Sequence, residues 1–175
     1  MSENPLRTDV WVHYGQVDLM DSPDVYDIPP MGGPPVGILA ETPGRVGNVK
    51  LLTGLHTGEV FLTVSVTDTD PGPELHSHQD AVELSVYLPN GAPILEEWGG
   101  GSPHDLPPLP AGPGWYRLRY HARDADVGLE VETLEEDQGP VDSYLLQIWP
   151  EAHSEARILR AESDFARNWL ASPAG

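Results

Sequence analysis

The sequence has no cysteine, few basic residues and no long apolar run. With no cysteine among 175 residues, a disulfide framework, a cysteine-ligated zinc site, an iron–sulfur cluster and a thiol nucleophile are excluded. No apolar stretch approaches the roughly 20 residues that cross a bilayer. The first residues lack the basic and then apolar segment of a secretory signal. We therefore expect a cytoplasmic protein that has no membrane span.

Basic residues are outnumbered by acidic ones. Lys and Arg total 9 against 28 Asp and Glu, and the net charge is −19. Phosphates of nucleic acids and anionic lipids would be repelled by this charge. We therefore expect no direct binding to nucleic acid or membrane, and a protein partner that is itself basic. The sequence leaves the oligomeric state open, a homo-oligomer included.

Alternating apolar residues dominate what is present. Period-two alternation is clearest at 59–69, 80–88 and 115–123, where apolar side chains fall on one face of an extended strand. Weaker patterns lie at 37–42, 46–52, 94–98, 143–149 and 156–159, and residues 8–20 form one strand with a bulge at Gly15. The sequence predicts an all-β, single-domain antiparallel β-sandwich over 1–175, with a Pro/Gly-rich loop at 21–35 and a helical tail at 161–172.

The strand from Gly114 to Asp124 concentrates basic and aromatic residues on its outer face. That face consists of Trp115, Arg117, Arg119, His121 and Arg123. One interpretation is a partner-binding platform, with Phe61 and Tyr87 on neighbouring outer faces as further anchors. The alternative is that the Arg residues pair with Glu83 or other carboxylates on adjacent strands.

An acidic run follows this strand. Its carboxylates include Asp124, Asp126, Glu130, Glu132, Glu135 and Glu136. Such a run is usually a solvated loop. It could also stand in for a row of phosphates and attract the basic cleft of a nuclease.

One segment has the spacing of metal ligands. His76, His78 and Glu83 resemble the first motif of the cupin family, in which two His and a Glu bind a divalent transition metal. Trp115 stands where the third His of that family should be. The alternative to a metal site is a solvated loop leading into a strand. Apart from this alternative, we expect no cofactor.

Catalytic motifs are otherwise lacking. The sequence has no Gly-x-Ser-x-Gly elbow and no phosphate-cradling glycine loop with Lys. This favours a protein that binds over one that catalyses, so we expect no catalytic residues. A sandwich that binds sugars or peptides through exposed Trp side chains is a further alternative.

The order of turns and strands resembles the competence protein J family. The matching features include Val12-His-Tyr14-Gly-Gln16, the Gly114-Trp-Tyr116 strand entry and Asp142-Ser-Tyr144. That family comprises small bacterial proteins that inhibit and regulate a DNA-entry nuclease. The resemblance implies a compact β-sandwich that binds a protein. We therefore expect an inhibitor or immunity-type partner of a basic protein such as a nuclease.

Overall fold

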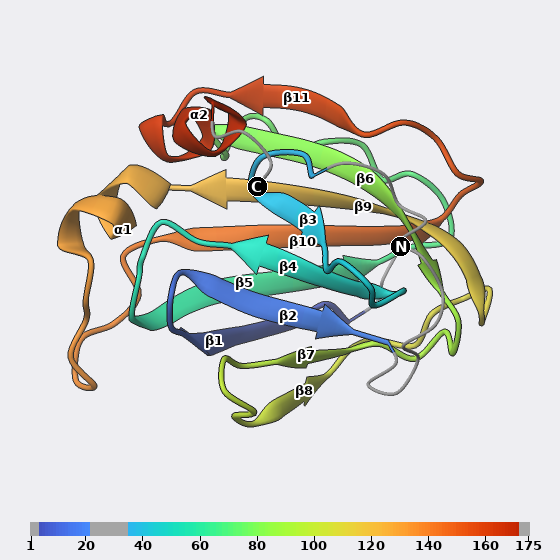
Figure 1. Ribbon diagram of the computed structural model, residues 1–175, viewed down its shortest axis with the longest axis horizontal. Coiled ribbons are helices and arrows are strands. Elements are labelled where there is room, and N and C mark those ends of the chain that lie inside the picture. The colour runs from blue at the N-terminus through green and yellow to red at the C-terminus, as the bar shows by residue number, and fades with distance from the viewer. Residues whose placement is uncertain (1–3, 22–34, 172–175) are drawn as a thin grey trace.

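The computed structural model describes residues 4–21 and 35–171, which form two stacked β-sheets (Figure 1). In the larger sheet the strand order is β1-β5-β10-β9-β6-β11, and in the smaller it is β3-β4-β2-β7-β8. The larger sheet comprises β1 (Leu6–Val12), β5 (Gly58–Val66), β10 (Ser143–Pro150), β9 (Gly114–Arg123), β6 (Asp80–Leu88) and β11 (Arg157–Ala161). The smaller comprises β3 (Leu39–Glu41), β4 (Asn48–Leu52), β2 (Gln16–Met20), β7 (Ile94–Glu96) and β8 (Pro103–Asp105).

Apolar side chains of the two sheets meet in the core. On β5 every second side chain is buried, from Val60 to Val66, because alternate residues of a strand face opposite sides. Tyr120 and Tyr144 also point inward, with stacked rings 5.5 Å apart between centroids. The all-β sandwich predicted from the sequence is confirmed. Its pairs are antiparallel except for β5 and β10, which run parallel.

The first predicted strand is in fact two strands. β1 belongs to the larger sheet and β2 to the smaller, joined by a tight turn at Tyr14 and Gly15. Both turn residues have positive φ, 55° and 60°. The expected bulge at Gly15 is therefore wrong, and the reversed alternation after it reflects a change of sheet.

Two helices lie at one end of the sandwich. α1 (Ala125–Val131) occupies part of the acidic run that was predicted as a loop, and α2 (Asp164–Ala171) lies within the predicted helical tail. Of the predicted loop 21–35, residues 22–34 lie outside the described residues, as does residue 172 of the tail. No helix in the described part of the chain is long and apolar enough to cross a membrane.

α1 lies directly against the loop between β4 and β5. A Cβ added to Gly54 would lie 1.9 Å from the carbonyl oxygen of Ala125, so only glycine fits there. A Cβ added to Gly128 would lie 2.4 Å from Oδ2 of Asp142. Two glycines thus allow the helix and the loop to approach each other closely.

Candidate functional site

The structure buries most of the predicted basic platform. Arg117 and His121 are 0% exposed and Arg119 is 2% exposed. Nε of Arg117 donates to Oε2 of Glu83 at 3.1 Å, and Nε of Arg119 donates to Oε1 at 2.7 Å. Nη2 of Arg157 donates to Oε2 at 2.7 Å. The cross-strand pairing of the arginines with Glu83 is therefore present. Arg117, Arg119 and His121 are buried and do not form an exposed surface.

Glu83 sits at the centre of this arginine cluster. Burial alone would raise the pKa of its carboxyl, but the hydrogen bonds from Arg157, Arg119 and Arg117 outweigh burial and lower it. Arg119 also lies 4.6 Å from the centroid of the Trp149 ring. Glu83 is thus a buried carboxylate held in its charged form by three guanidinium groups.

A surface segment covers the arginine cluster. We call residues 68–79 the strap, because they cross the outer face of the larger sheet between β5 and β6. Asp70 accepts from Nη1 and Nη2 of Arg119 at 2.9 and 3.2 Å, and the hydrogen bond from Arg119 is the main reason that the pKa of Asp70 is lowered. Nε2 of Gln147 donates to the Gly72 carbonyl at 3.0 Å. Side chains of the sheet therefore hold the strap in place.

His121 joins the strap to the sheet as a neutral ring. Its Nε2 accepts from the backbone N–H of Glu74 at 3.1 Å, which requires Nε2 to be unprotonated, and its Nδ1 lies 3.2 Å from the Leu145 carbonyl. Burial lowers the pKa of His121 to about 4. Protonation would place a second hydrogen against the Glu74 N–H and would break this contact.

The other predicted anchors fall into two groups at opposite ends of the larger sheet. Trp115 packs against Tyr87 with ring centroids 5.4 Å apart, at the end of β9 opposite α1. Arg123 pairs at the surface with Asp124 at 3.5 Å. Phe61 is 37% exposed on β5. Phe61 and Arg123 are both register partners of Ser143, so they lie at the other end of the sheet from Trp115 and Tyr87.

The three predicted metal ligands are not assembled. Both oxygens of Glu83 accept from arginines, and Nδ1 of His78 contacts the Glu74 carbonyl at 2.9 Å. His76 lies on the strap. Among the residues that the structure describes, no group of three His, Asp or Glu is arranged to hold a metal ion. Because arginines occupy the carboxylate, the cupin-like motif does not form the metal site that the sequence offered as an alternative.

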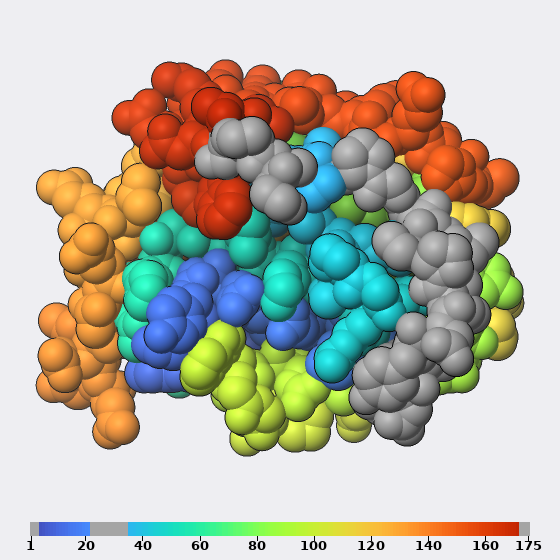
Figure 2. Space-filling view, in the orientation of Figure 1, coloured from blue at the N-terminus to red at the C-terminus, as the bar shows by residue number. Residues whose placement is uncertain are grey.

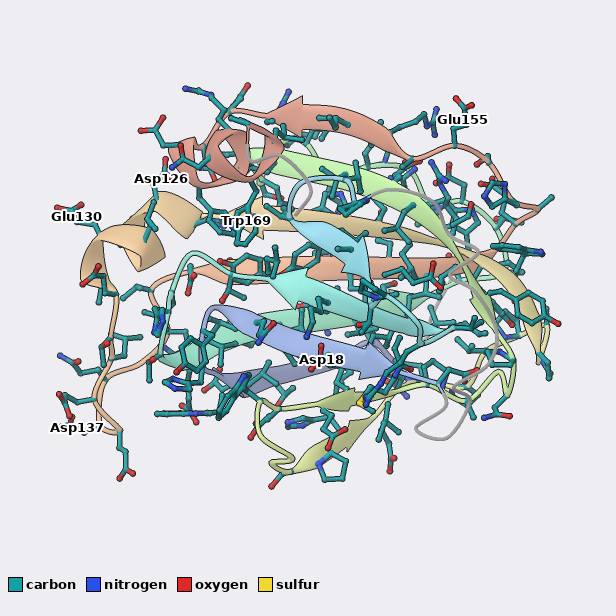
Figure 3. All side chains as sticks on the ribbon, in the orientation of Figure 1. Asp18, Asp126, Glu130, Asp137, Glu155 and Trp169 are labelled. Carbon is teal, nitrogen blue, oxygen red and sulfur yellow. The ribbon has the colours of Figure 1, made fainter. Side chains whose placement is uncertain are left out.

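The acidic run lies at the end of the sandwich occupied by the helices. The carboxylate of Asp126 accepts from the backbone N–H groups of Asp164 and Phe165 at 3.0 and 2.8 Å, so it caps the start of α2. Figure 3 shows Asp126 between the helices, Glu130 on the outer side of α1 and Asp137 at the tip of the following loop. The other predicted members are also exposed: Asp124, Glu132, Glu135 and Glu136.

A pocket opens at this end, and the sequence did not predict it. It has a volume of about 230 Å³ and is called the end pocket here. Its walls come from the β1–β2 turn, the loop after β4 and both helices, which meet on one face of the molecule (Figure 2). The lining residues are Tyr14, Gly15, Thr53, Gly54, His56, Leu129, Glu132, Phe165, Asn168 and Trp169.

Two aromatic side chains that line the end pocket, Tyr14 and Trp169, are exposed. Tyr14 is 60% exposed, Trp169 is 45% exposed, and Leu129 of α1 is 41% exposed. The Tyr14 ring also contacts Trp98 of the loop after β7, at 5.3 Å between centroids, and Trp98 is 40% exposed. Exposed aromatic residues grouped in this way are typical of a binding surface.

Two histidines adjoin this surface and share one hydroxyl group. Nδ1 of His13 and Nδ1 of His56 each lie 2.8 Å from Oγ1 of Thr57. The hydroxyl can donate to only one ring, so at least one of the two rings carries a proton on Nδ1. The His13 ring packs against Trp98 at 4.7 Å and against Tyr14 at 4.3 Å. The Thr57 hydroxyl thus holds the His13 and His56 rings in place beside Tyr14.

The backbone of the pocket wall is strained. Tyr14 has φ 55°, and Glu132, which ends α1, has φ 61° and ψ −51°. Residues with a side chain rarely adopt these conformations, which cost about 1–3 kcal/mol each and cluster at ligand sites. Only one other non-glycine residue of the described chain, Asp124, has a positive φ. The strain therefore points to the end pocket independently of its aromatic lining.

Buried polar groups hold the floor of the end pocket. The Gly54 N–H donates to the Tyr144 hydroxyl at 2.7 Å, and the Leu55 N–H donates to Oδ2 of Asp142 at 3.1 Å. The Tyr144 hydroxyl donates to the same carboxylate oxygen at 2.6 Å. Burial raises the pKa of Asp142, against the effect of these hydrogen bonds. The loop after β4 is thus fixed to the larger sheet from below.

Sequence reasoning found only part of this site. The predicted helical tail contains Phe165 and Trp169, which are four residues apart and so lie on one side of a helix, and both line the end pocket. Tyr14 carried a local signal, because an aromatic residue before glycine between two alternating segments is compatible with a positive-φ turn. That Tyr14 and Trp169 line the same pocket depends on the packing of distant elements and has no local signal.

Comparisons with known proteins identify a structure with a similar fold but no family to which the chain belongs. No protein-family model and no curated protein matches this sequence. Among solved structures, the chain is similar to the protein described as Crocagin biosynthetic gene J, with a TM-score of 0.56 and 16% identity over 87% of this chain and 100% of that chain. The resemblance to competence protein J is therefore wrong: its carriers, Gly-x-Tyr and turns between alternating segments, recur in unrelated antiparallel sheets. What the comparisons establish is a shared fold at low identity.

Proposed function

We propose that this protein is a non-enzymatic binding module for a basic polypeptide, which it holds at the end pocket. The observation that carries the proposal is the exposed aromatic lining of the pocket, built on a strained backbone. An apolar side chain of the partner would enter between Tyr14, Leu129 and Trp169. Large apolar side chains buried in such pockets are the usual energetic centre of a protein interface.

The charge around the end pocket supports a basic partner. Residues 124–156 contain no Lys or Arg, and this segment supplies Leu129 and Glu132 to the pocket wall. The only Arg of α2, Arg167, lies 3.3 Å from Asp164 in an ion pair. The carboxylates of this segment form an acidic rim beside the end pocket. Such a rim attracts cationic partners at long range and raises their association rate. The expected partner is a basic polypeptide rather than a nuclease in particular, because the family resemblance that implied a nuclease is wrong. The cytoplasmic location stays a prediction from the sequence.

A displayed library of random short peptides, panned against the full chain, tests this proposal. We expect enriched peptides to be basic and to carry at least one large apolar residue. Their affinity, measured by fluorescence anisotropy, should fall roughly 30-fold or more in Trp169→Ala, since loss of a central Trp costs about 2 kcal/mol or more. Trp115→Ala is the matched control, because Trp115 lies at the opposite end of β9.

Two results would overturn the proposal. One is the absence of any enriched peptide whose binding depends on Trp169. The other is equal weakening by Trp169→Ala and Trp115→Ala, which would show that the end pocket has no special part in binding. For a basic partner, the association rate should also fall as salt is added, because ions screen the acidic rim.

A further inference from the structure

A second pocket lies next to the end pocket and has a different chemical lining. We call it the side pocket; its volume is about 550 Å³. It combines one Trp ring with three carboxylates from the loop that follows α1. The lining residues are Trp11, Thr57, Thr133, Leu134, Glu135, Glu136 and Asp137.

A narrow, rigid ridge separates the two pockets. It consists of residues 56–57 and residues 132–134, which pair through a parallel bridge between Thr57 and Thr133. The N–H groups of His56 and Thr57 both donate to the Glu132 carbonyl at 3.0 Å, and the Leu134 N–H donates to the Thr57 carbonyl at 2.9 Å. His56 and Glu132 line the end pocket, whereas the next residues, Thr57 and Thr133, line the side pocket. One bound segment can therefore contact both pockets across the ridge.

The carboxylates of the side pocket have no cationic partner in the part of the chain that the structure describes. Among the described residues, no Lys, Arg or His forms an ion pair with Glu135, Glu136 or Asp137. All three are exposed, and Figure 3 shows Asp137 projecting from the tip of its loop. A cation placed here would gain the attraction of these carboxylates and would lie beside the Trp11 ring.

We propose that the side pocket binds a Lys or Arg side chain of the same polypeptide segment whose apolar residue fills the end pocket. This inference rests on the proposed function and adds a recognition rule to it: one large apolar residue and one cation, on either side of the ridge. The aliphatic stem of the Lys or Arg packs on Leu134, and the charged group lies between Trp11 and the carboxylates. Trp is the ring that attracts such cations most strongly.

Peptides enriched from the random library test this rule in a double-mutant cycle. The protein variant is Glu135→Gln with Glu136→Gln, and the peptide variant replaces its Lys or Arg by norleucine. We expect each change alone to weaken binding roughly tenfold, and the two together to weaken it little more than either one, because both remove the same contact. Glu130→Gln is the matched control: it removes one charge from α1, lines neither pocket, and should change affinity less than about twofold.

The outcomes separate this inference from the proposed function. Enriched peptides that depend on Trp169 but carry no required cation would overturn the inference and leave the proposed function standing. Additive effects in the cycle, or equal weakening by Glu130→Gln, would also overturn it, since both indicate general attraction to the acidic end. If no peptide depends on Trp169, both proposals fall together.

Discussion

Replacing Glu83 by Gln should destabilise this protein strongly, although the two side chains have the same shape. Glu83 is fully buried and accepts hydrogen bonds from three arginines, two of which are themselves buried. Gln keeps one oxygen acceptor but removes the negative charge, so Arg117 and Arg119 lose their shared counter-ion. Breaking a buried ion pair from one side costs about 3–5 kcal/mol. Asp70 limits the loss, because it still faces Arg119.

Urea denaturation followed by Trp fluorescence measures this cost as a change in the free energy of unfolding. For a chain of 175 residues, about 3–5 kcal/mol corresponds to a fall in Tm of roughly 6–20 °C. Glu130→Gln serves as the control, because Glu130 is exposed on α1, and it should change stability by less than about 0.5 kcal/mol. A loss below about 1 kcal/mol in Glu83→Gln would refute the reasoning, since it would mean that water reaches the arginines beneath the strap.

Three further predictions concern His121, Gly54 and Tyr14. The pKa of His121 is about 4 in the folded protein against an ordinary 6.5. The unfolded chain therefore binds the proton first, and stability should fall by up to about 3 kcal/mol as pH drops from about 6.5 to about 4. The free energy of unfolding, measured by urea denaturation at each pH, should depend less on pH across this range in His121→Gln than in the unaltered protein. Gly54→Ala places a methyl group against α1 and should cost about 2 kcal/mol or more in urea denaturation, whereas Gly139→Ala, with open space around it, should cost less than about 0.5 kcal/mol. Tyr14→Gly relieves about 1–2 kcal/mol of backbone strain and loses ring contacts worth about 0.5–1.5 kcal/mol. Its Tm should stay nearly unchanged while peptide affinity, measured by anisotropy, falls at least roughly tenfold.

The sequence was most informative where a strand buries one face. The alternation from Val60 to Val66 predicted β5 and its inward side chains, because burial on one side imposes a period of two. The sheet to which a strand belongs was not predictable in this way. β1 and β2 read as one strand, since a tight turn at Tyr14 and Gly15 leaves the apolar pattern nearly continuous.

Contacts between distant segments explain what the sequence could not show. Pairing of Arg117 and Arg119 with Glu83 followed from adjacent strands, so it could be foreseen as an alternative. The strap over this cluster could not, because Asp70 reaches Arg119 across 49 positions of the chain. α1 was missed because it is a short helix rich in acidic residues. Its stability comes from packing at Gly54 and Gly128, which only the three-dimensional structure reveals.

The position of β10 has a consequence for how the chain is made. β10 lies between β5 and β9 in the middle of the larger sheet, yet of the described strands only β11 leaves the ribosome after it. Until residue 150 has emerged, β5 and β9 each have an unpaired edge facing the other. Such edges are templates for pairing with another chain. Nascent or truncated chains that stop before Ser143 should therefore aggregate or require a chaperone, and the sandwich should fold only after β10 has emerged.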